Sequence, residues 1–356
     1  MIGRDPAARR RRARLLAAAA LVATVVGAVV GVHRIGARRI VDDVVAVNPT
    51  LVLVALALMC LAMATRAVAW RAMLSAAFPG TRITLPPVLR ATSIGVLLSA
   101  TMPARVGEPA RAMVVARNVD PTGSGTGPLP RVLGTMVSQT ILNVVALVGL
   151  GVLTFSTYFG GRLGSLTVAT IVPLVALVVV LVAVPTVLKL LPRRRLGPLV
   201  DRVEGALAGV RAGLAVFRSP RPAFEAVTGQ LGAWSLQWLS CYALLVAFGV
   251  DHAAGLGAAA AVLVAVNVTA VVPVTPSNLG VFQAACVLVL SGTNALSPAE
   301  ALGYGIVLQA VEITTAVAMG TPALIREGLG RRGVSLLGPH AAATPRGAAG
   351  APCRDT

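Results

Sequence analysis

Two short stretches decide how this chain is expected to fold: SATMPARVGE at residues 99–108 and VTPSNLGVFQ at residues 274–283. Each stretch places a proline, two further residues, a branched aliphatic residue and then a glycine, and each follows an apolar run. Proline and glycine interrupt helices, and an interrupted helix at membrane depth is tolerated only where protein or a water-filled cavity surrounds it. Two such breaks in corresponding halves of a membrane protein indicate a substrate-binding or transport centre.

The composition is typical of a helical membrane protein. Of the 356 residues, 56% are hydrophobic and only 12% are charged, whereas a soluble domain is nearer half apolar and a quarter charged. Several apolar stretches reach the roughly 20 residues that a helix needs to cross a bilayer. The sequence therefore predicts an all-α polytopic membrane protein.

The apolar stretches fall into two membrane halves, 15–158 and 159–330, which follow the same order of span, span, interrupted segment and span. The interrupted segments at 86–104 and 255–292 are predicted to be re-entrant helical hairpins, because they are too broken to read as plain spans. About six full spans are expected, over residues 15–32, 50–70, 132–155, 166–191, 230–250 and 299–324.

The net charge of +18 resides mainly in the segments between these apolar stretches. With the basic N-terminal residues 1–14 in the cytoplasm, the inner segments hold about 25 of the 31 Lys and Arg residues and the outer segments about four. A basic cytoplasmic loop at 189–221 belongs to the inner set. We predict a multi-pass plasma-membrane protein with both termini in the cytoplasm and a disordered tail at 331–356, which is rich in Gly, Pro and Ala.

This topology has a geometric consequence. Three full spans in each half turn the second half over relative to the first, so the first hairpin enters from the cytoplasm and the second from outside. The prediction is an inverted repeat, a transporter architecture in which the two breaks meet near the middle of the membrane. It depends on both hairpins being re-entrant, because a hairpin that crossed fully would remove the inversion.

Charged residues bracket the first break. Arg105, Glu108 and Arg111 follow one another at a spacing of three, and Pro109 suits the first turn of a helix, so the three side chains are expected on one helix face. Charges at membrane depth are costly and tend to be functional. We interpret the three residues as a cationic pocket for a lipid phosphate, in which Glu108 orients an arginine. The alternative is an interfacial ion-pair cluster that only fixes topology.

Other polar residues lie at the second break and in the last span. Asn267 and Asn278 flank the break, where unwound backbone needs polar partners, and Gln283 lies just beyond it. Gln309 and Glu312 are three residues apart in the last span, so their side chains share a face. Glu312 is a candidate proton or cation site because it is a carboxylate deep in an apolar span. Hydrogen bonding between helices explains the amides as well as substrate contact does.

The second and third spans also carry polar side chains. Arg66 lies late in the second span and is expected to extend to the inner interface, although it is also, with Arg105, a possible ion-pair partner of Glu312. Gln139 and Asn143 are four residues apart in the third span and therefore share a face.

No motif in the sequence supports another chemistry. A Ser/His/Asp arrangement, a phosphate-binding loop and a dinucleotide fingerprint are all missing, so no enzyme activity is expected. The four cysteines lack the spacing of a metal site, and we expect no metal, no cofactor and no structural disulfide. The basic residues are not interleaved with aromatic ones, so the expected partners are membrane lipids and not nucleic acid.

The run LLSATMPARVGEPARA at 97–112, followed by PSNLGVFQAA at 276–285 and a last span that ends near Gly320, resembles the lysylphosphatidylglycerol synthase transmembrane, or flippase-like, family. The resemblance covers most of residues 10–330, and the first run fits the family pattern P-x-R-x-G-E-x-x-R. It implies a protein that moves an aminoacylated phospholipid or a polyprenyl-linked glycolipid between leaflets. Larger members add a soluble aminoacyl-transfer domain, and no synthase activity is expected from this chain alone.

The second run departs from the family pattern. The family usually has a Gly-Gly pair at the positions of Ser277 and Asn278, a glutamate at Gln283 and often an arginine at Gln309. Exchange of an acid and a base, each for glutamine, preserves the net charge. We therefore hypothesise that Gln283 and Gln309 touch, so that a neutral amide pair replaces an ion pair.

The preferred interpretation is an integral membrane protein that binds, and translocates between leaflets, a phospholipid or a polyprenyl phosphate-linked lipid. Arg105 and Arg111 would attract the phosphate, and Glu108 would orient an arginine or bind an amino group. Two alternatives stay open. The chain could be a non-transporting scaffold or partner for a glycosyltransferase or lipid-modifying enzyme, or an ion-coupled small-solute transporter with Glu312 as the coupling site.

Overall fold

The computed structural model describes seven segments of the chain, namely residues 47–101, 106–119, 128–157, 216–217, 219–270, 278–292 and 296–328. These segments form helices and contain no strand. The helices are α3 (Pro49–Ala77), α4 (Leu85–Thr101), α5 (Gly107–Val119), α6 (Leu129–Thr157), α9 (Pro220–Ala247), α10 (Asp251–Thr269), α11 (Val281–Gly292) and α12 (Pro298–Arg326).

Several sequence predictions fall outside the described residues. They are the basic N-terminal segment 1–14, the spans at 15–32 and 166–191, nearly all of the loop at 189–221, and the tail at 331–356.

Three of the predicted spans are confirmed as long apolar helices. Within the described segments, α3, α6 and α12 are long and apolar enough to cross a membrane. They cover the spans predicted at 50–70, 132–155 and 299–324, with added turns at the ends. The described part of the chain is therefore all-helical and typical of a membrane protein.

Proline and polar caps fix where the long helices begin. Pro298 occupies the first turn of α12, and Ser297 and Glu300 cap it reciprocally in a capping box. Pro220 likewise occupies the first turn of α9. Helix α9 thus begins ten residues before the start of the span predicted at 230–250, because its first turns carry polar side chains and so escape a search for apolar residues.

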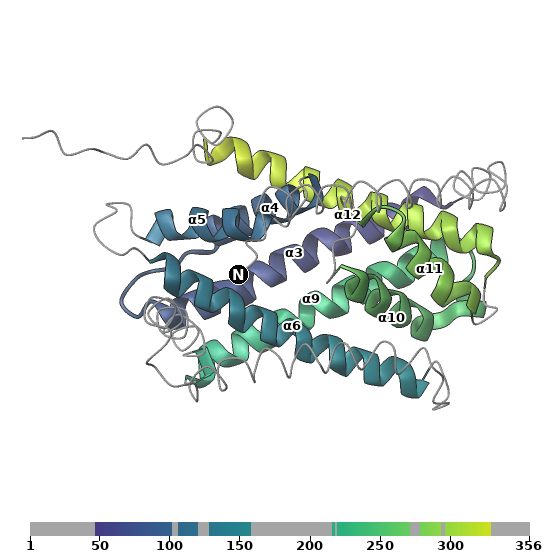
Figure 1. Ribbon diagram of the computed structural model, residues 1–356, viewed down its shortest axis with the longest axis horizontal. Coiled ribbons are helices and arrows are strands. Elements are labelled where there is room, and N and C mark those ends of the chain that lie inside the picture. Colours follow the sequence, from purple (N-terminus) through teal and green to yellow (C-terminus); the bar gives the residue numbers. More distant parts are fainter. Residues whose placement is uncertain are drawn as a thin grey trace, which may run out of the picture.

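Helices α3 and α9 form the centre of the bundle and run antiparallel along each other (Figure 1). The backbone N–H of Asn48, just before α3, donates to the carbonyl of Ala247 at the end of α9, and Arg71 near the end of α3 meets Glu225 near the start of α9. A Cβ atom on Gly229 would lie 3.2 Å from the Cβ atom of Ala69, so the glycine lets the two helices approach closely.

Two pairs of shorter helices occupy opposite ends of the bundle. Helices α4 and α5 lie toward the end where α3 finishes and α6 begins, and α10 and α11 lie toward the end where α9 finishes and α12 begins (Figure 1). Each pair encloses one of the two Pro-Gly breaks of the sequence. The predicted hairpin at 86–104 is thus the first part of a longer helix pair whose second arm is α5.

Charge separates the two ends of the bundle. We call the end at which α3 finishes and α6 and α9 begin the basic end. Among the described residues, every arginine except Arg66 and Arg111 lies there, whereas the opposite end carries Asp251 and Glu300. Two ion pairs join helices at the basic end, Arg71 with Glu225 at 3.0 Å and Arg90 with Glu327 at 2.7 Å.

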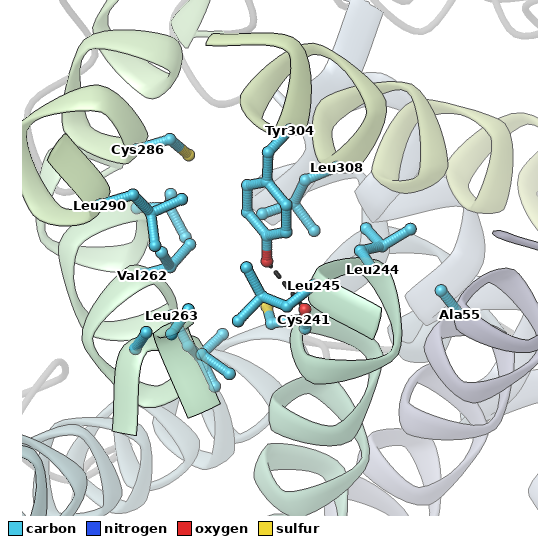
Figure 2. Packing of buried hydrophobic residues seen from close by; sticks show 14 of the residues in the cluster. Ala55, Cys241, Leu244, Leu245, Val262, Leu263, Cys286, Leu290, Tyr304 and Leu308 are labelled. Atoms are coloured by element: carbon cyan, nitrogen blue, oxygen red, sulfur yellow. Dashed lines mark hydrogen bonds between the residues drawn. The ribbon is translucent and has the colours of Figure 1, made fainter. Parts of the chain in front are cut away.

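Buried apolar side chains form two separate cores. The first core, at the opposite end, gathers residues of α9–α12 around Tyr304, whose hydroxyl donates to the carbonyl of Cys241 at 2.9 Å (Figure 2). The second core, at the basic end, surrounds Trp70 and includes residues of α3, α4, α5 and α6. Each helix pair therefore packs into an apolar core of its own.

Candidate functional site

A central polar layer separates the two apolar cores. We define it by polar side chains that each long helix carries where it passes from one core to the other, namely Arg66 on α3, Gln139 and Asn143 on α6, Gln230 on α9 and Glu312 on α12. Polar groups at membrane depth are costly unless they are paired or line a functional path. The layer is therefore the candidate site.

Arg66 is held inside the bundle. Its Nη2 donates to Oε1 of Gln237 on α9 at 2.7 Å, so the expectation that Arg66 extends to the inner interface is wrong. The guanidinium turns toward α9 because Gln237 offers it an acceptor in the α3–α9 interface. Its charge interacts with those of Glu312, Glu108 and Arg111. No described acid lies within 4 Å of Arg66, so Glu312 is a charged neighbour and not a contact ion pair.

The amides of the layer join α6 to α9. The Oδ1 atom of Asn143 accepts from Nε2 of Gln230 and, at 3.2 Å, from Nε1 of Trp234. Gln139 is 1% exposed, and neither atom of its amide has a hydrogen-bond partner in the described part of the chain. A buried unpaired amide costs about 1–3 kcal/mol, so the layer holds unused hydrogen-bonding capacity.

The first break leads into α5, whose first turn carries the candidate carboxylate. Arg111 Nη2 lies 2.6 Å from Glu108 Oε2, and the Arg111 side chain is 11% exposed against 50% for Glu108. The prediction that these two side chains share a helix face is confirmed. Arg105, the third member of the predicted pocket, lies outside the described residues.

Aromatic and glycine contacts hold Arg111 in place. Its guanidinium carbon lies 4.9 Å from the centroid of the Trp70 ring, a cation–π arrangement. Trp70 is fully buried, and its Nε1 donates to Oγ1 of Thr135 at 3.0 Å. On the other side, a Cβ atom on Gly95 would lie 3.0 Å from the Cβ atom of Arg111. The arginine is therefore clamped between α3 and α4.

The second break ends in two residues with left-handed backbone. Asn278 has φ of 53° and Gly280 has φ of 84°. Asparagine is among the few residues other than glycine that adopt this conformation readily, which fits its position where the resemblance places a glycine. Gln283 then accepts from the backbone N–H of Gly280 at 2.7 Å and so caps the first turn of α11.

The hypothesis that Gln283 and Gln309 touch is confirmed. Nε2 of Gln283 donates to Oε1 of Gln309, which joins α11 to α12. Gln309 is 5% exposed, and Gln283 is half-buried. The pair is positioned by Gly305, one turn earlier on α12, where a Cβ atom would lie 3.3 Å from the Cα atom of Gln283.

Helix α12 contacts a helix beside each break. Gln309 bonds α11 at the second break, and Glu312 follows one turn later in the central polar layer. Farther along, a Cβ atom on Gly320 would lie 2.8 Å from the carbonyl oxygen of Ser93 on α4, close to the first break. The site therefore extends along one face of α12.

Some residues of the site carry no signal in the sequence. Gln237 and Trp70 are not recognisable as candidates, because each acts through a partner on another helix. Gln230 is likewise missed, because the sequence treats it only as the first residue of the span predicted at 230–250.

Comparison with protein families agrees with the resemblance in the two motifs. A family model described as "Lysylphosphatidylglycerol synthase TM region" matches residues 15–320, which includes every residue of the site. No curated protein sequence matches the chain.

Proposed function

The chain belongs to the lysylphosphatidylglycerol synthase transmembrane-region family, and on that premise we propose that it binds the headgroup of a phospholipid or polyprenyl phosphate-linked lipid in the central polar layer and moves it between leaflets. The observation that carries this proposal is the charge of Arg66 in the central polar layer, which interacts with the charges of Glu312 on α12 and of the Arg111–Glu108 ion pair on α5. A purely structural bundle gains little from such costly groups.

The roles follow from charge and position. Arg111, with Arg105 nearby in sequence, attracts the phosphate at the first break, and Glu108 orients Arg111 through their ion pair. At the second break the polar contacts to the headgroup are neutral and come from Asn278, Gln283 and Gln309. Glu312 lies on the route of the headgroup between the two breaks. We place headgroup entry at the first break, because it carries the charges.

The arrangement of helices supports an inverted repeat. Exchanging α3 with α9, α4 with α10, α5 with α11 and α6 with α12 reproduces the set of principal helix–helix packings. For example, α4 packs against α3, α5 and α12, and α10 packs against α9, α11 and α6. The equivalent helices α3 and α9 run antiparallel, as an inverted repeat requires.

The charges at the two ends support an orientation. Positively charged segments stay in the cytoplasm, so we propose that the basic end faces the cytoplasm of a cell with this protein in its plasma membrane. The helix pair α4–α5 then enters from the cytoplasm and α10–α11 from outside, as re-entrant hairpins.

A lipid-exchange assay tests the proposed function. The purified chain is reconstituted into vesicles that contain fluorescent phosphatidylglycerol, and a membrane-impermeant quencher reports how much lipid changes leaflet. The wild-type chain is expected to accelerate exchange, and the substitutions Arg111→Ala and Glu108→Ala are expected to abolish the acceleration. Arg117→Ala is the matched control, because Arg117 is an exposed arginine on the same helix.

The alternatives give different outcomes in the same vesicles. Exchange that persists in both variants, or never exceeds that of protein-free vesicles, would contradict lipid translocation and favour a membrane scaffold or enzyme partner. Exchange or solute uptake that depends on pH or sodium, and loses that dependence on Glu312→Gln, would favour an ion-coupled transporter.

A further inference from the structure

We propose that Arg66 and Arg111 bind one and the same phosphate group, so that the phosphate site of the proposed function lies between α3 and α5 and includes an arginine outside both sequence motifs. This inference rests on the proposed function and adds to it the residue that completes the phosphate site. Arg66 precedes the first motif by more than 30 residues, so only the packing of the helices brings the two arginines to one region.

Both arginines lie near Trp70. The guanidinium carbon of Arg111 lies 4.9 Å from the centroid of the Trp70 ring. Arg66 precedes Trp70 by four residues on α3, which places it one turn away on the same helix face. The two positive charges lie close enough to repel each other. An anion between them would turn this repulsion into two attractions.

Each guanidinium also keeps an unused hydrogen-bond donor. Arg66 is fixed by its Nη2 donation to Gln237 at 2.7 Å, and Arg111 by its Nη2 contact with Glu108 at 2.6 Å. The Nε atom of each arginine is buried, and neither has an acceptor in the described part of the chain. Phosphate supplies several charged acceptor oxygens, and arginine is the side chain best suited to them.

A third arginine shows why burial matters for this assignment. The Nε atom of Arg71 also has no partner among the described residues. However, the Arg71 side chain is 35% exposed and its charge is paired with Glu225 at 3.0 Å. Water therefore reaches Arg71, whereas the Arg111 side chain is only 11% exposed and Arg66 has no acid within ion-pair distance among the described residues.

A binding measurement tests the inference separately from lipid exchange. Dihexanoyl phosphatidylglycerol is titrated into the full-length chain in detergent. Emission from Trp70 reports binding in a W234F/W238F variant, in which Trp70 is the only tryptophan, and calorimetry on the unmodified chain checks the affinity. Arg66→Gln and Arg111→Gln are each expected to weaken binding by about tenfold or more. The double variant should lose much less than the product of the two single losses, because both arginines hold the same group.

Controls separate loss of the site from loss of the fold. Arg117→Gln removes an exposed arginine from α5 and should leave binding unchanged. Arg66→Lys keeps the charge but loses the planar fork, so it should bind better than Arg66→Gln and worse than wild type. Dihexanoyl glycerol, which lacks the phosphate, should not bind. Each variant is compared only if it elutes from gel filtration as wild type does.

The outcomes are distinct. Normal binding by Arg66→Gln, or losses that multiply in the double variant, would overturn the inference while wild-type lipid exchange still supports the proposed function. If inorganic phosphate binds as tightly as the lipid, the assignment of the site to a lipid headgroup would be wrong. If the wild-type chain binds neither probe and exchanges no lipid, the proposed function itself fails.

Discussion

At the scale of single residues, Gln283 makes two contacts that a charged side chain could not make equally well. Its oxygen accepts from the backbone N–H of Gly280, and its nitrogen donates to Oε1 of Gln309. An amide can do both because it carries a donor and an acceptor. The second break is thus closed by a neutral pair that needs no counter-charge.

Gln283→Glu is expected to destabilise the protein, because it places an uncompensated negative charge beside the buried Gln309. The cost should be roughly 3 kcal/mol, the size seen when one member of a buried ion pair is left alone. Addition of Gln309→Arg should recover much of that loss. Thermal unfolding in detergent of the two single variants and the double variant measures the coupling. Strictly additive effects would contradict the assigned pairing.

Asn278 offers a cleaner test of backbone conformation. Its φ of 53° is left-handed, and a residue with a Cβ atom and no special tolerance pays about 1–2 kcal/mol there. Asn278→Ala should therefore lower the free energy of unfolding by that amount, whereas Asn278→Gly should leave it nearly unchanged. Thermal unfolding measures the stability of both variants. Equal losses would mean that contacts of the Asn side chain, and not its left-handed backbone conformation, stabilise the break.

The residues of the site differ in how far the sequence can predict them. Glu108 and Arg111 are three positions apart on one helix, so local geometry alone predicts their ion pair. The Arg66–Gln237 contact spans 171 positions and depends on how α3 and α9 align. No local pattern contains that alignment. The Gln283–Gln309 contact is predictable only because the resemblance suggests a paired exchange of charges.

At the scale of elements, α4 packs closely on two partners through their glycines. A Cβ atom on Gly107 would overlap the carbonyl oxygen of Gly95 and Oγ of Ser99, and one on Gly320 would meet the carbonyl of Ser93. Small residues let helix backbones approach each other in membranes, where lipid gives no hydrophobic drive for association. Helix α4 is therefore fixed between α5 and α12.

Gly107→Ala and Gly320→Ala are each expected to destabilise the bundle by about 1–3 kcal/mol, because the added methyl group must push backbone apart. Gly149→Ala is the matched control, since a Cβ atom on Gly149 would meet nothing within 4 Å among the described residues. It should be neutral or stabilise α6 by up to about 1 kcal/mol through helix propensity. Unfolding midpoints of the three variants test this order, and equal losses would rule out close packing as the cause.

Element boundaries reveal what hydropathy can and cannot predict. The spans at 50–70, 132–155 and 299–324 are predictable because their apolar runs are long. Hydropathy starts α9 ten residues late, because its first turns carry charged side chains at the basic end. Helix α5 is predicted from Pro109 and the spacing of its charged residues, not from hydropathy, because its first turns carry Glu108 and Arg111. The first turns of α9 are joined to α3 by the ion pair of Glu225 with Arg71, which no apolar pattern marks.

At the scale of the whole molecule, the two ends differ in charge. Cysteines introduced at Ser297 or His252, at the end opposite the basic end, should react with a membrane-impermeant maleimide on intact cells, in a background without the four natural cysteines. A cysteine at Thr81, at the basic end, should react only after permeabilisation. The physical reason is retention of the arginine-rich end in the cytoplasm. The reverse pattern would invert the proposed orientation.

Helix α12 links the two helix pairs, because it contacts α11 beside the second break and α4 beside the first. Its contacts at Gln309 and Gly320 are eleven residues apart, or about 16 Å along the axis of one continuous helix. Because a continuous helix is rigid, a displacement at one of these contacts is transmitted to the other. A shift of α12 against α4 should therefore strain the hydrogen bond between Gln309 and Gln283 on α11. If the chain moves lipid as proposed, opening of the bundle at one break should therefore be coupled to closure at the other, without direct contact between the α4–α5 and α10–α11 pairs.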